Sequence, residues 1–164
     1  MKRLITLVLL AGIAAAAWAQ PALDGKIAEG EYSAVRTKDG FTLAASLSAD
    51  GATLSVAVSG ATQGWIAIGI GTLKMNGSFM IMGYVADGKP FVSYELGKGY
   101  SHSPTAAPGA SATVVESGGT TTLEVALPAA DFVKNGMLQT IAASGAKDDF
   151  RSKHSTRTAL ELKL

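Results

Sequence analysis

The sequence predicts an all-β protein, an antiparallel β-sandwich of about eight to eleven strands, and three observations carry this prediction. Apolar and polar residues alternate over short segments, as in strands that are buried on one face. Turn signals such as Asp50-Gly51 and Asp87-Gly88 separate these segments at intervals typical of a sandwich or a barrel. No long segment after residue 19 has the apolar period of a helix.

Residues 1–19 have the pattern of a secretory signal peptide. Lys2 and Arg3 precede the apolar run Leu4–Ala17, and Ala17-Trp18-Ala19 forms a small-x-small cleavage site. We therefore expect a periplasmic or secreted protein whose mature chain is one domain, residues 20–164. The apolar run is short for a bilayer span and no later segment is long enough, so we expect no transmembrane segment in the mature chain.

The strands expected in the mature domain are, in chain order, Ala28–Ala34, Phe41–Ser48, Thr53–Ser59, Trp65–Ile70, Phe79–Val85, Pro90–Leu96, Ala112–Glu116, Thr120–Leu127, Leu138–Ser144 and Arg157–Leu164. The second and third alternate most clearly between apolar and polar residues. The fourth and fifth are continuous apolar runs rich in β-branched, aromatic and Met side chains, which is typical of buried strands. The segment Gly97–Gly109, which contains His102, is expected to be a loop.

The composition excludes several kinds of site. There is no Cys, hence no disulfide, thiol nucleophile, iron–sulfur cluster or covalently attached c-type haem, and any haem must bind non-covalently. With two His and no Cys, a structural zinc site is disfavoured. Without Lys2 and Arg3 the chain has 12 basic and 13 acidic residues, a balance that argues against a nucleic-acid partner. No G-x-S-x-G string is present to suggest a hydrolase.

Met75 and His154 are the two residues for which the sequence allows either a structural role or a role as metal ligands. Met75 lies in the polar loop Gly71–Ser78, where a Met either folds back to fill a gap or serves as a soft metal ligand, as in Met/His haem sites. His154 precedes the last strand among basic neighbours and is either a solvated loop residue or the second ligand. Loops from distant parts of a chain meet at the strand ends of a sandwich, so the residues alone leave both possibilities open.

Four stretches, taken together, resemble a DOMON domain, and more closely its cytochrome branch, which includes the haem domain of cellobiose dehydrogenase. They are GWIAIGIG…KMNGS…GYV from Gly64 to Val85, Asp24-Gly25-Lys26-Ile27 followed by Glu29-Gly30-Glu31-Tyr32, TTTLEVALP at 120–128, and DDFRSKHSTRTALELKL at 148–164. The resemblance covers nearly the whole mature chain. One departure is Ser93, where many members carry an Asp after the second hairpin strand.

The resemblance implies an immunoglobulin-like β-sandwich that holds one haem b without covalent attachment. It implies Met75 and His154 as the axial ligands of the iron, with Arg157 completing a His-x-x-Arg pattern. The other residues expected around the haem are Trp65, Phe79, Tyr84 and Phe150 in the pocket wall, and Lys74, Lys153 and Arg157 near the propionates. The expected function is single-electron transfer to or from an unidentified redox partner protein, as a carrier or redox subunit rather than a catalyst.

The alternative is a haem-free DOMON module that binds a carbohydrate or a partner protein. In that case Met75 packs inward and His154 is a loop residue. His102 is expected to take no part in haem binding, because it lies in the Gly97–Gly109 segment outside the resemblance.

Overall fold

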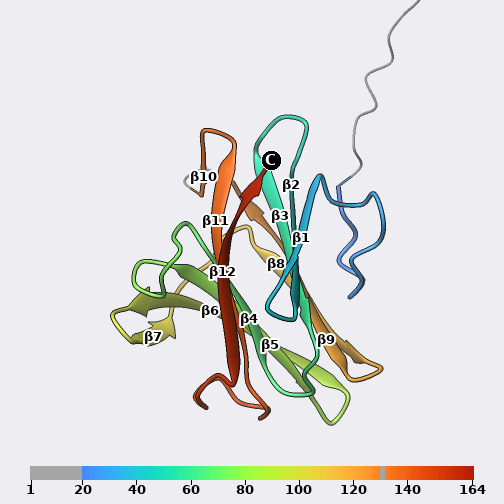
Figure 1. Ribbon diagram of the computed structural model, residues 1–164, viewed down its shortest axis with the longest axis vertical. Coiled ribbons are helices and arrows are strands. Elements are labelled where there is room, and N and C mark those ends of the chain that lie inside the picture. The colour runs from blue at the N-terminus through green and yellow to red at the C-terminus, as the bar shows by residue number, and fades with distance from the viewer. Residues whose placement is uncertain (1–19, 130–131) are drawn as a thin grey trace, which may run out of the picture.

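The computed structural model describes residues 20–129 and 132–164, and the predicted signal peptide lies outside these described residues. In the described residues, twelve antiparallel strands form two sheets that pack face to face (Figure 1). The prediction of an all-β sandwich is therefore confirmed. The described residues form no helix, and so no helix in them has the length and apolarity needed to cross a bilayer.

The five-stranded sheet has the order β1-β2-β3-β9-β8, made of Ala34–Lys38, Phe41–Leu47, Thr53–Gly60, Thr120–Pro128 and Ser111–Ser117. The seven-stranded sheet has the order β10-β11-β4-β5-β6-β7, made of Val133–Lys134, Met137–Ser144, Ile66–Ile70, Phe79–Ala86, Lys89–Lys98 and Ser101–Pro104. The last strand, β12 (Thr156–Lys163), also pairs with β11.

The hairpins follow from the turn residues. Asp87 and Gly88 both have positive φ, 50° and 71°, which is the backbone of a tight two-residue turn between β5 and β6. That turn fixes the register of β5 on β6, in which Met80 lies opposite Glu95 and Met82 lies opposite Ser93. This register decides which side chains share the outer face of the seven-stranded sheet.

The core lies between the two sheets and is purely aliphatic and aromatic. Its largest fully buried side chains are Phe41, Leu43, Leu54, Ile66, Ile68, Ile70, Ile81, Leu123, Leu138 and Leu162. Because successive side chains of a strand point to opposite faces, the residues between the three isoleucines of β4 must face outward. The outward face of β4 is nevertheless buried, since all five of its residues are inaccessible to solvent.

The N-terminal segment is tied across the outer face of the five-stranded sheet by Glu124, a fully buried carboxylate on β9. The Tyr32 hydroxyl donates to Glu124 Oε1 at 2.7 Å, and the backbone N–H groups of Gly25 and Lys26 donate to Oε2 at 2.6 and 3.3 Å. Burial raises the pKa of Glu124, and burial together with this carboxylate raises the pKa of Tyr32.

Three strands were not predicted from the sequence: β1, β7 and β10. The expected strand Ala28–Ala34 is wrong, because β1 begins only at Ala34 and runs to Lys38. Four of the five residues of β1 are exposed, so this edge strand carries no apolar alternation that would reveal it. The segment Gly97–Gly109 is likewise not one loop, because Gly97 and Lys98 end β6 and Ser101–Pro104 forms β7.

Candidate functional site

A second apolar cluster lies on the outer face of the seven-stranded sheet and is separate from the core. Its buried members are Trp65, Ala67, Met80 and Met82, and Met75, Tyr84, Ala143 and Phe150 pack against them half-buried. We call these eight residues the outer-face cluster. Three of its members are Met, whereas the interior cluster contains none. Met75 and Phe150 come from loops, so two loops cover this face of the sheet.

The β4–β5 loop brings Met75 onto this face. The backbone N–H of Gly77 donates to the carbonyl of Gly97 at 2.9 Å, and the N–H of Gly97 donates to the carbonyl of Ser78 at 2.9 Å. A Cβ atom at residue 97 would collide with the backbone carbonyl of Met75. Glycine at this position of β6 therefore allows the loop to lie directly on the strand, with the Met75 side chain packed on the outer-face cluster.

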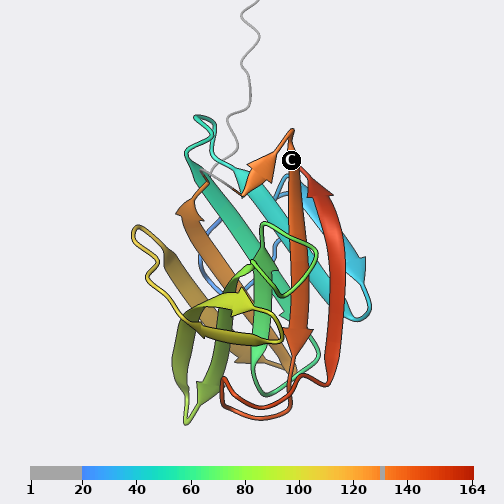
Figure 2. The ribbon, with the colours of Figure 1, turned by 90° about the vertical axis from the view of Figure 1, so that its left-hand side faces the viewer.

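The segment between β11 and β12 brings His154 to the other end of β4. The indole N–H of Trp65 donates to Ser152 Oγ at 2.9 Å, and the N–H of Ser155 donates to the carbonyl of Ser144 at 2.8 Å. His154 lies between these two anchors and is half-exposed. Figure 2 shows the β4–β5 loop above this segment on the side of the molecule that faces the viewer.

The same segment is turned by a short network around Asp149. The backbone N–H groups of Arg151 and Ser152 donate to Asp149 Oδ1 at 2.7 and 2.5 Å, and these bonds hold the pKa of that carboxyl below its usual value. The basic residues that follow, Lys153 and Arg157, are both exposed. Arg157 lies on β12 opposite Ala143, a member of the outer-face cluster, whereas Lys153 lies in the segment before β12.

The structure gathers four of the predicted site residues, Met75, Trp65, Tyr84 and Phe150, in one cluster. The predicted residues His154, Lys153 and Arg157 lie outside this cluster. Among the predicted aromatic side chains, Phe79 is the exception. It points to the opposite face of β5, where it packs on the interior cluster with its ring centroid 5.6 Å from that of Phe132. The reason is the two-residue period of the strand, which places Met80 and Phe79 on opposite faces.

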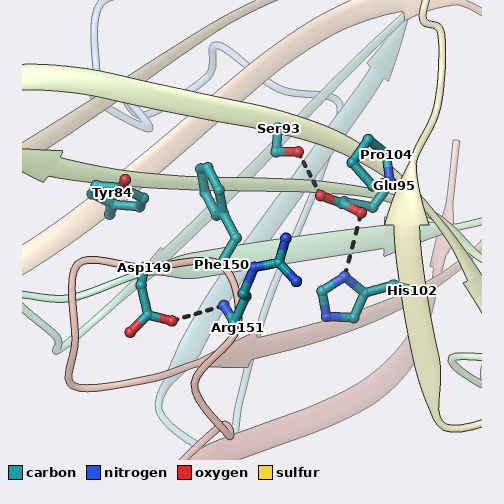
Figure 3. Close-up of a pocket in the computed structure, with 8 residues that line it drawn as sticks. All are labelled: Tyr84, Ser93, Glu95, His102, Pro104, Asp149, Phe150 and Arg151. Carbon is teal, nitrogen blue, oxygen red and sulfur yellow. Dashed lines mark hydrogen bonds and ion pairs between the residues drawn. The ribbon is translucent and has the colours of Figure 1, made fainter.

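A pocket of about 260 Å³ adjoins the outer-face cluster over β5, β6 and β7 (Figure 3). Its lining consists of Tyr84, Ser93, Glu95, His102, Pro104, Asp149, Phe150 and Arg151. Ser93 Oγ donates to Glu95 Oε1 at 2.5 Å, and His102 Nδ1 lies 3.4 Å from Glu95 Oε2. Glu95 is only 4% exposed.

The sequence analysis missed this pocket. It placed His102 in a loop, whereas His102 lies on β7 opposite Gly97 and faces Glu95. The only signal in the sequence is the spacing Ser93-x-Glu95, which puts two polar side chains on one face of a strand. In the described part of the chain, no three His, Asp or Glu side chains come together as metal ligands.

No protein-family model matches the sequence, and no curated protein matches it. Solved structures do share its fold. One is the cytochrome domain of cellobiose dehydrogenase from Myriococcum thermophilum, with a TM-score of 0.60, 16% identity, and coverage of 78% of this chain and 76% of that one. Another is the cytochrome b domain of pyranose dehydrogenase from Coprinopsis cinerea, with a TM-score of 0.61, 16% identity, and coverage of 79% and 80%. The predicted resemblance to cytochrome domains of this type is thus confirmed for the fold.

Proposed function

We propose that this chain is a b-type cytochrome domain that carries single electrons, with Met75 and His154 as the axial ligands of a non-covalent haem. The observation that supports it most is that the Met75 loop and the segment that carries His154 both lie against the outer-face cluster, the first through Met75 and the second through Phe150 and Ser152. Inward packing of Met75 by itself fits the haem-free alternative equally well. The shared fold with two solved cytochrome domains supports the same assignment.

The residues on this face fit a haem. The available donors are a thioether and an imidazole, a pair that binds haem iron in cytochromes. Between the two loops the sheet carries Ala67, Gly69 and Ala143 on this face, together with the larger side chains of Ile141 and Met80. A Cβ at Gly69 would collide with Ser78 Oγ and with the Ile141 side chain, so the space directly above this glycine is filled by the protein itself.

The bound haem would supply a one-electron Fe(III)/Fe(II) couple. The protein's part is to set its environment. Met75 and His154 would hold the iron, and the Met75 thioether would favour its reduced state and raise its potential. Trp65, Met82 and Phe150 exclude water from one side. Lys153 and Arg157 are exposed cations that can offset propionate charge at the rim.

The proposal includes export. The signal-like residues 1–19 direct the chain to the periplasm or the cell exterior, where a redox partner protein exchanges electrons with it. N-terminal sequencing of the mature protein is expected to begin at or near Gln20. A mature cytoplasmic protein that retains residues 1–19 would contradict this part of the proposal.

The decisive experiment is a visible spectrum of protein purified from cells supplied with haem. The proposal predicts a low-spin haem spectrum that is lost in His154→Ala. His102→Ala is the matched control, since it also removes an imidazole from this sheet face, and it is expected to keep the spectrum. The alternative, a haem-free module that binds a carbohydrate or a partner protein, predicts a colourless protein. An unchanged haem spectrum in His154→Ala would rule out the ligand assignment.

A further inference from the structure

The β4–β5 loop, which carries Met75, and the hairpin between β6 and β7 lie against each other. The backbone N–H of Gly99, in the β6–β7 turn, donates to Asn76 Oδ1 in the loop at 2.8 Å. Figure 1 shows both segments at the left of the molecule, and Figure 2 shows them on the side that faces the viewer. The loop and the turn therefore form one continuous surface beside a proposed haem ligand.

Exposed apolar side chains gather on this surface. In the described part of the chain, five large apolar side chains are exposed, and three of them belong to the loop or the hairpin: Leu73, Leu96 and Tyr100. Tyr100 is fully exposed, so none of the described residues covers its ring. Exposed apolar side chains that gather on one surface, with polar residues around them, are typical of contacts with another molecule.

The charged side chains of this surface are both positive. Within residues 71–78 and 96–105 there is no Asp, Glu or Arg, and the two lysines, Lys74 and Lys98, are exposed. No carboxylate of the described residues forms an ion pair with either lysine. Complementary charges steer two proteins together and set their orientation. Two free cations beside an apolar centre therefore match a partner surface that carries carboxylates.

We propose that this surface docks an electron-transfer protein whose own docking face is acidic. We call it the docking surface, and it consists of Leu73, Lys74, Leu96, Lys98 and Tyr100. The inference rests on the proposed function, because Lys74 directly precedes Met75 and docking here places the partner next to that proposed ligand. The apolar side chains supply the contact, and the two lysines orient the partner's carboxylates.

The test is a titration of the isotope-labelled mature protein with oxidised flavodoxin, an acidic electron-transfer protein, followed by amide chemical shifts. The ionic strength is about 10 mM, at which surface charges act over roughly 30 Å. We expect saturable binding whose shifts centre on residues 73–76 and 98–100, and whose affinity falls as salt is added. The readout on the wild-type protein does not require any variant to fold.

Two variants separate the charged part of the surface from the apolar part. Lys98→Glu is expected to weaken binding about tenfold at low salt, because it reverses one of the two steering charges. Tyr100→Ala is expected to weaken binding at low and at high salt alike, because it removes apolar contact without changing the charge. Tyr100 is fully exposed, so this variant is expected to fold as the wild type does.

Lys89→Glu is the matched control, because Lys89 is an exposed lysine at the other end of the same strand, β6, and its replacement changes the net charge equally. It should bind flavodoxin as the wild type does. Equal losses of affinity in Lys89→Glu and Lys98→Glu would overturn the proposal, and so would the absence of saturable binding or wild-type shifts that map away from the docking surface.

Two other occupants would also overturn it. They are a second copy of this chain, if the same shifts appear when the protein is concentrated alone, and a membrane, if the protein binds phosphatidylserine vesicles and not flavodoxin. The titration reports docking whether or not haem is bound. A colourless protein that binds flavodoxin at this surface would therefore contradict the haem assignment alone, and a haem protein that does not bind it would contradict the docking surface alone.

Discussion

The indole N–H of Trp65 donates to the hydroxyl of Ser152 at 2.9 Å and joins two segments that lie 87 residues apart in the sequence. Trp65 is buried immediately before β4 in the outer-face cluster, and Ser152 precedes His154 by two residues. The bond therefore fixes the segment that carries one proposed ligand to the strand that leads to the other. It is a side-chain link between the two halves of the candidate haem site.

Removing this bond is expected to loosen the His154 segment. Ser152→Ala leaves the Trp65 N–H without its partner and should lower the free energy of unfolding by about 1 kcal/mol, which denaturant titration measures. If His154 binds haem, the same variant should release haem faster. Ser111→Ala, at an exposed position of β8, is the control and should change neither quantity. Equal rates of haem release from both variants would show that Ser152 does not contribute to the haem site.

Gly97→Ala is expected to displace the Met75 loop, since the added methyl group would occupy the position of the Met75 carbonyl. Overpacking of this kind costs roughly 1–3 kcal/mol of stability. The diagnostic result is a weakened or altered haem spectrum in the protein that remains folded. Gly83→Ala, on β5, is the control because its methyl group would press on Val114 in the core. It should lower the melting temperature without altering the spectrum of the folded fraction.

Met75→His is expected to retain haem but lower its reduction potential. A thioether favours Fe(II), and a second imidazole does not. Potentiometric titration of the purified holoprotein measures the change. Met137→His, at a half-buried position on β11 outside the outer-face cluster, provides the comparison and should leave the potential as it is. A potential unaffected by Met75→His would exclude Met75 as a ligand.

The contribution of Glu124 to the stability of the fold should fall as the pH rises above about 4.5. Burial raises the pKa of Glu124 in the folded state above its ordinary value of 4.5. The folded state thus holds this proton more tightly than the unfolded state, and the resulting stabilisation is complete below that ordinary value and is lost as the pH rises through the raised pKa. Glu124→Gln cannot titrate, so its unfolding free energy should depend less on pH over this range.

Chemical denaturation at a series of pH values between about 4 and 7 tests this expectation. Glu29→Gln is the control, because Glu29 is exposed near the same N-terminal segment. It should follow the wild-type curve. A Glu124→Gln curve parallel to the wild type would show that this carboxyl does not contribute to the pH dependence.

The sequence predicted the strands that have one apolar and one polar face. It also predicted the turns whose residues favour a particular backbone conformation. The strands β2 and β3 alternate clearly, and Asp87-Gly88 adopts the positive φ values that its residues favour. The face to which each side chain of β4 and β5 points was harder to predict, because these two strands are apolar on both faces. In such strands the alternation rule gives no inward direction, which is why Phe79 was placed in the site wall.

The Glu95 pocket was beyond prediction for a different reason. Its residues come from β5, β6, β7 and the segment before β12, and only the pairing of β6 with β7 brings His102 to Glu95. β7 reads SHSP, four residues with no apolar alternation and a proline, so nothing in the sequence marks it as a strand. The pairing depends on the neighbouring hairpin and not on the residues of β7 themselves.

The hydrogen bonds that join the N-terminal segment to Glu124 have a consequence for the order in which the chain folds. The backbone N–H of Gly25 donates to Glu124, which lies 99 residues later in the chain. Asp39, beside β1, accepts a hydrogen bond from Thr158 on β12, 119 residues later. Contacts this distant in sequence form slowly, because the closure of a long loop comes before the contacts that stabilise it. A chain that emerges N-terminus first therefore cannot form the contact between Asp39 and Thr158 until its last strand is available. Until these contacts form, the incomplete sheets expose apolar surface and strand edges, so the chain depends on protection from aggregation during that interval.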